Sequence, residues 1–499
     1  MRLIPTTMAT QHPDNAGTPW WYQRPFISTS AELEECFRCF SELGIDEYNW
    51  DWEGKFVDEA VVDRLLHKHF EYFSTHQLGK DKFLTFRIPN PRVETQFRLA
   101  RAFMVILTSS QMAKSLGLAT PIFETILPLT ESASEIIEIQ KAFQEIVTLK
   151  HPLLAMHDSL EMIEVIPLFE QVEKIMDSAV ILKEYFALYK KTFGKNPTLM
   201  RPYCARSDPA LNSGLIPTMF SLKVALSSYH ALEKETGVKL FPMVGTGSLP
   251  FRGGVAPNRI DRVIKEYAGF KTIIIQSAFR YDYPQNQVVV ALQKLHKELP
   301  KQKALVVSSS QEKAVREVVP DFQRVYRQSI EGLAPRINRV AREVGRRRER
   351  VQHVGLFGYS RGVGNVTLPR AIPFTASLYS LGIPPELIGA GRGIQIAMRR
   401  GLWDSVSDLY VNLKYDLAQA GRFLNRTLLV AQAQIDPVFA PILDDITILE
   451  SVLGISFEPK TDNEKEHLTL TNALWRALEN GKDITELITQ MGVMRKSLG

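Results

Sequence analysis

Residues 121–149 read PIFETILPLTESASEIIEIQKAFQEIVTL, and this stretch decides the fold class. Its first seven residues, PIFETIL, form a short apolar run of the kind that makes a buried strand. From residue 131 onward, apolar side chains recur at spacings of three and four, after a Thr-Glu-Ser sequence that supplies capping side chains. The stretch therefore predicts a strand followed directly by an amphipathic helix.

The same alternation of strand and helix patterns recurs through most of the chain. Parallel strands need crossover connections, so this alternation predicts a parallel sheet covered by helices. Eight such units favour a closed (β/α)8 barrel over an open doubly wound sheet, and no GxGxxG motif follows the first strand. The eight predicted strands are residues 45–52 (IDEYNWDW), 83–87 (FLTFR), 121–127 (PIFETIL), 162–169 (MIEVIPLF), 198–204 (TLMRPYC), 239–244 (KLFPMV), 272–276 (TIIIQ) and 353–357 (HVGLF).

The length of 499 residues allows roughly three domains of about 150 residues, yet α/β barrels commonly use about 200 to 250 residues or more as one unit. We expect one catalytic unit over residues 1–499, with a barrel core over 40–370. Beyond Arg370 the pattern is helical to the end. This predicts a helical C-terminal subdomain over 371–499 that packs on the barrel.

The connection between the seventh and eighth predicted strands is long. Residues 311–352 read as a helical region with a break at residues 333–335, where a proline interrupts the pattern. Residues 303–308 (KALVVS) compete as a further strand. In the helical region that follows, breaks are expected at 382–385 and 459–462, since both contain proline.

Composition limits the classes of partner. Sixty basic and 55 acidic residues leave a net charge of +5, too small to indicate nucleic acid or an anionic membrane as a partner. Three cysteines cannot make a disulfide framework and fit a reducing compartment. The N-terminal MRLIPTTMATQHPDN lacks the apolar core of a signal peptide, and no apolar run approaches the roughly 18 residues of a membrane span. We expect a cytoplasmic protein.

Charged residues follow most of the predicted strands. In barrels of this type the chemistry lies at the carboxyl ends of the strands and in the loops after them. Arginines and carboxylates together suit an anionic substrate bridged by a metal ion, because arginine donates bidentately to phosphate and carboxylate. The candidates are Arg87, Glu170, Arg206, Asp208, Arg252, Arg280 and Arg361.

Two of these carboxylates are candidate metal ligands. Glu170 and Asp208 follow neighbouring strands and offer the hard oxygen atoms that magnesium prefers. Glu124, on the preceding strand, competes with Glu170 on local pattern alone. Any one such acid is better explained as a loop cap or a surface ion pair, so the hypothesis depends on the joint appearance of acids and arginines.

Two loops carry further candidates. Residues 245–257 (GTGSLPFRGGVAP) place Arg252 among glycines, which let backbone N–H groups approach an anion. His12 lies in TQHPDN (10–15), where the following residues favour a fixed turn, and histidine can exchange protons near neutral pH. Taken alone, a plain turn explains the first loop equally well and a structural role explains the histidine better.

Three other features have simpler structural explanations. The pair Cys36 and Cys39 lies in a helical pattern without a second pair for zinc, which indicates helix packing. The basic run at residues 346–350 is typical of a solvated helix face rather than a nucleic-acid site. The acids at 46, 47, 51 and 53 alternate with aromatic residues, as on a strand with one polar face, and we assign them no chemistry.

Taken together, the order of these motifs resembles phosphoenolpyruvate carboxylase, specifically its short archaeal-type form. TQHPDN is similar to the family's histidine motif, and PLFEQ (167–171) followed by RSDPALNSG (206–214) resembles its metal-binding glutamate and aspartate segments. This order and spacing favours Glu170 over Glu124. Further similarities are FRGGVAP (251–257), LPRAIPF (368–374) and the terminal MGVMRKSLG (491–499).

The resemblance implies a barrel with extra helices, a homotetramer, and Mg2+ or Mn2+ as cofactor. The substrates would be phosphoenolpyruvate and bicarbonate, converted through carboxyphosphate and a metal-stabilised enolate to oxaloacetate and phosphate, an anaplerotic reaction. Glu170 and Asp208 would hold the metal, and His12 and Arg252 would be catalytic. The substrate contacts would be Arg87, Arg206, Arg280, Arg361 and Arg370.

The chain also departs from the longer bacterial and plant form. That form carries a lysine where this chain has Leu211 and Asn212, and a histidine with a second arginine where this chain has GTGS (245–248). The alternative function is another metal-dependent barrel lyase or phosphotransferase acting on phosphoenolpyruvate or pyruvate, which would need no bicarbonate. A non-catalytic helical protein that binds polyanions through residues 346–350 is the third hypothesis.

Overall fold

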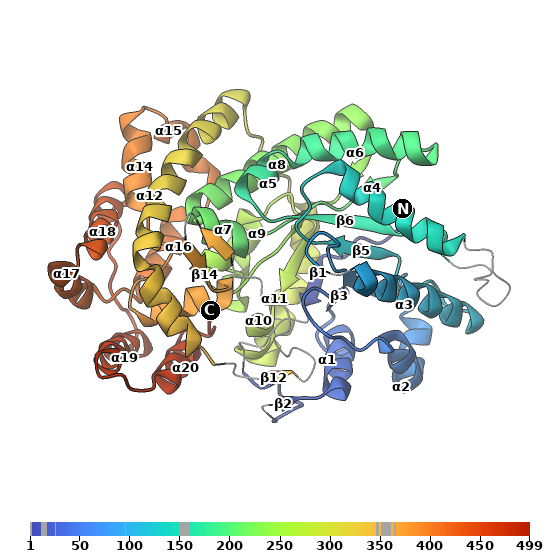
Figure 1. The fold of residues 1–499 in the computed structure, drawn as a ribbon, viewed down its shortest axis with the longest axis horizontal. Helices are drawn as coiled ribbons and strands as arrows, with labels where there is room; N and C mark the ends of the chain where they lie inside the picture. Colours follow the sequence, from blue (N-terminus) through green and yellow to red (C-terminus); the bar gives the residue numbers. More distant parts are fainter. Residues whose placement is uncertain are drawn as a thin grey trace.

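In the computed structural model, the described residues are 2–10, 17–24, 26–94, 96–148, 160–345, 349–350, 361–363 and 366–499. Eight parallel strands close into a barrel in the order β1-β11-β10-β8-β6-β5-β4-β3, so the predicted (β/α)8 class is confirmed. Figure 1 shows the strands at the centre of the half of the molecule that contains helices α1 to α6. The barrel strands are β1 (Thr7–Thr10), β3 (Glu47–Asp51), β4 (Phe83–Arg87), β5 (Glu124–Leu127), β6 (Glu164–Phe169), β8 (Tyr203–Cys204), β10 (Met243–Val244) and β11 (Thr272–Ile275).

Seven of the eight predicted strands are confirmed, and the remaining position in the barrel is filled by a strand that was not predicted. The barrel closes because β1 pairs with both β11 and β3, with Met8 opposite Ile274 and Glu47. The sequence of β1, TMAT, lacks the run of large apolar residues that marks the other strands. The predicted strand at 353–357 lies outside the described residues, and the closed barrel needs no ninth strand.

Helices cover the barrel between successive strands. The helix predicted after residues 121–127 is present as α4 (Ala133–Val147), with Ile136, Ile139 and Phe143 buried. The pair Cys36 and Cys39 lies buried on α1, as the packing interpretation expects. The other covering helices are α1 (Thr29–Ser41), α2 (Val61–Thr75), α3 (Gln96–Ser115), α5 (Val172–Met176), α6 (Ser178–Phe193), α7 (Ser207–Ser213), α8 (Leu215–Thr236), α9 (Ile260–Glu266), α10 (Ser277–Tyr281) and α11 (Gln285–Glu298).

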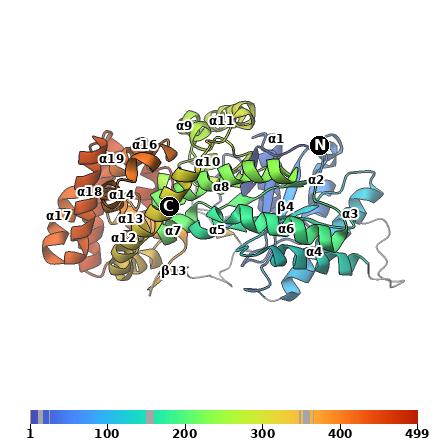
Figure 2. The same ribbon diagram turned by 90° about the horizontal axis from the view of Figure 1, so that it is seen from above.

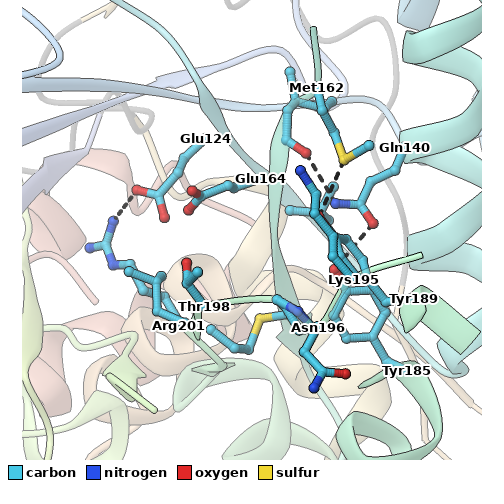
Figure 3. A pocket seen from close by; sticks show the side chains of 15 residues that line it. Glu124, Gln140, Met162, Glu164, Tyr185, Tyr189, Lys195, Asn196, Thr198 and Arg201 are labelled. Atoms are coloured by element: carbon cyan, nitrogen blue, oxygen red, sulfur yellow. Dashed lines mark hydrogen bonds and ion pairs between the residues drawn. The ribbon is translucent and has the colours of Figure 1, made fainter. Parts of the chain in front are cut away.

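The amino-terminal end of the barrel interior is closed by buried ion pairs. Arg201 donates to Glu47 Oε2 at 2.6 Å and to Glu124 Oε2 at 2.8 Å, and burial opposes its charge while both acids raise its pKa. A pocket of about 260 Å3 opens beside them, and Figure 3 shows Glu124 and Glu164 on one side of it and Tyr185 on the other. This end of the barrel is therefore filled by charges that neutralise one another.

The long helix α12 (Ser309–Arg342) contradicts the predicted break at residues 333–335. It continues through both Pro320 and Pro335 and ends at Arg342 rather than at residue 352. A proline removes one backbone hydrogen bond, and here the apolar face of the helix, including Leu333 and Ile337, is buried against its neighbours. Packing therefore outweighs the local cost. Residues 303–308, the competing strand candidate, adopt no regular structure.

The chain after Arg370 is helical, as predicted, and the two predicted breaks at 382–385 and 459–462 are present. Further breaks between these helices were not predicted. Figures 1 and 2 show these helices gathered beside α12 on one side of the barrel. One apolar core includes Ala9 in the barrel and Leu498 near the end of the chain. The helices are α13 (Ala371–Ser380), α14 (Ala390–Arg399), α15 (Trp403–Val406), α16 (Leu413–Gly421), α17 (Arg426–Ile435), α18 (Ala440–Leu453), α19 (Asp462–Glu479) and α20 (Thr485–Met494).

The first barrel strand begins at Thr7, before the start of the predicted core at residue 40. The division into a core over 40–370 and a subdomain over 371–499 stays a prediction. Outside the barrel, short two-stranded sheets pair β12 (Glu349–Arg350) with β2 (Phe26–Ile27), β13 (Arg361–Val363) with β14 (Val366–Leu368), and β7 (Leu199–Met200) with β9 (Lys239–Leu240). Among the described residues, none of the helices combines the length and apolarity that crossing a membrane requires.

Candidate active site

Arg87 is the last residue of β4 and is held by two acids from the neighbouring strand and its loop. Its Nε and Nη2 atoms donate to the two oxygens of Asp51, both at 2.7 Å, and its Nη1 lies 2.8 Å from Glu53 Oε2. Asp51 also pairs with Lys55. From sequence, Asp51 and Glu53 are assigned no chemistry, because their alternation with aromatic residues indicates only a strand with one polar face. In a closed barrel that face is the interior, so these acids orient Arg87.

The two proposed metal ligands lie near one tyrosine inside the barrel. Burial raises the pKa of the Tyr203 phenol, Arg87 lowers it, and the charges of Glu170 and Asp208 raise it further. Glu170 follows β6 directly and is buried, while Asp208 lies in the first turn of α7. Arg87, Glu170 and Asp208 each lie at or after the end of a barrel strand, so all three belong to the carboxyl end of the barrel.

The competing ligand Glu124 belongs to the opposite end. It is the first residue of β5, and its carboxylate is paired with Arg2 and Arg201. Because parallel strands start at the same end of a barrel, Glu124 cannot share a site with acids that follow the strand ends. The position of Glu124 within its strand thus removes it as an alternative to Glu170.

Arg252 is a buried cation that forms no ion pair with an Asp or Glu side chain among the described residues. Its Nε donates to Ser207 Oγ at 3.1 Å, its Nη2 to Gln276 Oε1 at 2.9 Å, and its Nη1 to the backbone oxygen of Gly499 at 2.7 Å. Burial lowers the pKa of the guanidinium to about 10, and only nearby Asp208 opposes this effect. An anion placed beside Arg252 would compensate the buried charge.

Arg206 lies behind the loop that carries Arg252. Its Nη1 donates to the carbonyl oxygen of Phe251 at 3.0 Å, its Nη2 to that of Pro250 at 3.2 Å, and its Nε to Met219 Sδ at 3.2 Å. Only 1% of its surface is exposed. Arg206 thus supports this loop, and its contact with substrate stays a prediction.

Arg280 is also buried, and two of its nitrogen atoms contact protein groups. Its Nη1 lies 2.9 Å from Cys39 Sγ and 3.2 Å from Glu35 Oε1, and its Nη2 donates to the carbonyl oxygen of Thr10 at 3.1 Å. Thr10 is the last residue of β1. Arg280 therefore fixes the carboxyl end of β1 at Thr10, the first residue of the predicted histidine motif.

The structure places the backbone of Arg361 and of Arg370 but does not describe His12. His12 lies outside the described residues, although Thr10 before it binds Arg280 and the Gly17 N–H after it donates to Asp282 Oδ1 at 2.9 Å. Arg361 lies in β13, of which the backbone is described and which contacts α7. Arg370 immediately precedes α13, which also contacts α7. These elements converge on the helix that carries Asp208.

Sequence reasoning missed three partners of Arg252: Ser207, Gln276 and Gly499. Ser207 and Gln276 follow barrel strands β8 and β11, so strand-end position could have identified them, but a neutral side chain carries no charge pattern. The contact with Gly499 has no local signal. Among the described residues, no group of three or more His, Cys, Asp or Glu side chains could hold a metal ion.

The fold and this end of the barrel define a (β/α)8-barrel enzyme whose site combines acids with buried arginines. The family model described as phosphoenolpyruvate carboxylase matches residues 4–499, and the chain belongs to that family. Phosphoenolpyruvate carboxylase from Leuconostoc mesenteroides is 38% identical over 100% of this chain and 99% of its own length. The enzyme of that name from Metallosphaera sedula is 37% identical over 100% of this chain and 100% of its own length. The one from Methanothermobacter thermautotrophicus is 37% identical over 99% of this chain and 100% of its own length.

Proposed function

We propose that this protein carboxylates phosphoenolpyruvate with bicarbonate to give oxaloacetate and phosphate. The observation that carries the proposal is the buried guanidinium of Arg252, which forms no ion pair with an Asp or Glu side chain among the described residues and feels the charge of nearby Asp208. Family membership over residues 4–499 supports the same reaction. A cytoplasmic homotetramer is proposed as the working form, and light scattering after size-exclusion chromatography tests the oligomeric state.

The donor set at the carboxyl end of the barrel fits magnesium or manganese. These ions use one or two carboxylates and complete their coordination with water and substrate oxygens, and Glu170 and Asp208 supply that number of acids. When bound, the ion would act as a Lewis acid and neutralise developing negative charge on substrate oxygens. Zinc in a closed protein site would need about four ligands, and that donor set is absent among the described residues.

In the first step an oxygen of bicarbonate forms a bond to phosphorus, and the bond between phosphorus and the enol oxygen breaks. The products are carboxyphosphate and the enolate of pyruvate. Arg252 donates to oxygens of the transferred group, where charge develops in the transition state. Ser207 and Gln276 hold two of its nitrogens in place. Arg87, Arg361 and Arg370 would contact phosphate or carboxylate. For Arg206 and Arg280, whose guanidinium groups already donate to backbone carbonyl oxygens, we propose a supporting role in place of the substrate contact predicted from sequence.

In the second step His12 accepts the proton of carboxyphosphate, which breaks into carbon dioxide and phosphate. The methylene carbon of the enolate then bonds to carbon dioxide, giving oxaloacetate. Water must be excluded, because a protonated enolate would leave as pyruvate. His12→Asn should abolish oxaloacetate formation while phosphoenolpyruvate and metal binding persist, and an unchanged carboxylation rate would remove His12 from the mechanism.

The alternative of a lyase or phosphotransferase acting on phosphoenolpyruvate or pyruvate is separated by one assay. Oxaloacetate is measured with malate dehydrogenase and NADH, and phosphoenolpyruvate, Mg2+ and bicarbonate are omitted in turn. We expect each omission to stop turnover. Turnover to another product without bicarbonate would favour the alternative.

Arg252→Ala should lower kcat by about 10³, the scale found when an arginine that stabilises phosphoryl transfer is lost.

A further inference from the structure

The backbone of Phe251, the residue before Arg252, is held from two sides by buried polar side chains. The Phe251 N–H donates to Glu386 Oε1 at 2.7 Å, and the Phe251 carbonyl oxygen accepts from Arg206 Nη1 at 3.0 Å. The Phe251 ring also stacks on Phe374, with ring centroids 5.8 Å apart. The sequence singled out Arg206 but not Glu386, which lies between α13 and α14 and more than 130 residues from the loop.

Glu386 is fully buried, and its acceptor oxygen is shared. Tyr379 of α13 donates its O–H to the same Oε1 atom at 2.8 Å, while Oε2 has no hydrogen-bond partner. A buried carboxylate is costly unless it accepts hydrogen bonds. Glu386 Oε1 accepts from Phe251, in the loop of Arg252, and from Tyr379, in helix α13. The free-energy cost of burying the Glu386 carboxyl is therefore offset only while that loop stays against α13.

The same cluster reaches the other side of Arg252 through the end of the chain. The Arg495 guanidinium lies over the Tyr379 ring, 5.1 Å from its centroid, and its Nη2 donates to the carbonyl oxygen of Leu498 at 2.9 Å. The next residue, Gly499, accepts from Arg252 Nη1. Glu386 therefore contacts the backbone before Arg252, and through Tyr379 and Arg495 it supports the acceptor of the Arg252 side chain.

We propose that Glu386 is a positioning residue for Arg252, holding its loop through the Phe251 N–H and its side-chain acceptor through Tyr379 and Arg495. This rests on the proposed role of Arg252 in phosphoryl transfer. A misplacement of about 1 Å in a group that acts on the reacting atoms can lower a rate roughly 10²-fold. Because such an interaction is made mainly in the transition state, its loss lowers kcat and leaves KM nearly unchanged.

The test compares Glu386→Ala, Glu386→Asp and Glu386→Gln. Alanine removes the acceptor, and aspartate keeps a carboxyl group but withdraws its oxygen from the Phe251 N–H. We expect both to lower kcat by about 10- to 100-fold, with KM for phosphoenolpyruvate within about threefold of the wild type. Glutamine keeps an acceptor oxygen at the same distance and should restore most of the rate. If the Glu386→Ala variant does not fold, Glu386→Asp still tests the proposal.

Asp445→Ala is the matched control. Asp445 is another fully buried carboxylate that accepts a backbone N–H, that of Gly389 at 2.7 Å, but its side chain contacts Arg392 rather than the Arg252 loop. We expect this variant to lose thermal stability while kcat stays within about twofold. An equal loss of kcat in the control, or in Glu386→Gln, would overturn the positioning role.

A double-mutant cycle separates this inference from the proposed function. If Glu386 acts through Arg252, Glu386→Ala should add almost nothing in an Arg252→Ala background, whereas independent effects would multiply. No oxaloacetate formation by the wild-type protein would contradict the proposed function itself. If the wild-type protein forms oxaloacetate and both Glu386→Ala and Glu386→Asp do so at the same rate, only the role of Glu386 would be contradicted.

Discussion

Arg252 Nη1 donates a 2.7 Å hydrogen bond to the backbone oxygen of Gly499, which lies 247 positions later in the sequence. Ser497 donates its hydroxyl to the same oxygen at 3.0 Å. Figure 1 shows the end of the chain between the barrel and the C-terminal helices. The helical region is thus more than a cover for the barrel, because it supplies an acceptor to the side chain on which the proposed phosphoryl transfer depends.

Gly499→Ala should therefore lower activity. A Cβ atom at this position would collide with the backbone oxygen of Ile372 in α13, so the residue must move and its oxygen leave Arg252. We expect kcat to fall about tenfold or more. Gly345→Ala is the control, since its Cβ would meet only a Thr485 methyl at 3.5 Å. Equal kcat in wild type and Gly499→Ala would show that this contact does not position Arg252.

Asp51→Asn tests how Arg87 is oriented. The substitution removes the charge that holds Nε and Nη2, and leaves Glu53 as the remaining acid on Arg87. We expect KM for phosphoenolpyruvate to rise about tenfold, because Arg87 is proposed to bind substrate in the ground state. Asp177→Asn breaks an exposed pair with Arg316 and should leave KM unchanged. A normal KM in Asp51→Asn would argue against a substrate contact by Arg87.

The choice of Glu170 over Glu124 can be measured without activity. Mn2+ binding by electron paramagnetic resonance should weaken about tenfold or more in Glu170→Gln and Asp208→Asn, because each removes an anionic oxygen. Glu124→Gln should bind Mn2+ normally. This variant should unfold at a lower temperature, because the buried Arg201 loses one of its negatively charged partners. Breaking a buried ion pair in this way lowers the free energy of unfolding by about 3–5 kcal/mol. Normal Mn2+ binding by Glu170→Gln would remove Glu170 as a ligand.

Sequence patterns predicted most of the barrel because its strands are short apolar runs buried on both faces. Residues 272–276 (TIIIQ) show this clearly, and β11 is found there. The pattern failed at β1, where Thr7 and Thr10 are buried by closure of the barrel rather than by their own hydrophobicity. It also failed at Pro335, where tertiary packing of α12 preserves the helix.

The site was predictable as a set of charges but not as a geometry. Position after a strand identified Arg252, Arg206 and Arg280. It could not show that Arg206 donates to backbone carbonyls or that Arg280 contacts Cys39, because carbonyl and sulfur acceptors leave no charge pattern in the sequence. The role of Asp51 was missed for a related reason, since alternation alone does not reveal whether the polar face of a strand meets solvent or the barrel interior.

Glu386 should also make stability depend on pH. Burial raises the pKa of its carboxyl from 4.5 to about 7. Between these values the unfolded chain is ionised while the folded protein keeps the proton, so stability falls as pH rises and is fully reduced above about pH 7. At about 1.4 kcal/mol per pH unit this amounts to roughly 3 kcal/mol. Glu386→Gln cannot ionise, so calorimetry should find its unfolding temperature less sensitive than that of the wild type between about pH 5 and 7. The same pH dependence in both proteins would mean that Glu386 does not titrate in this range. The Glu386 carboxyl would then be partly hydrated in the folded protein.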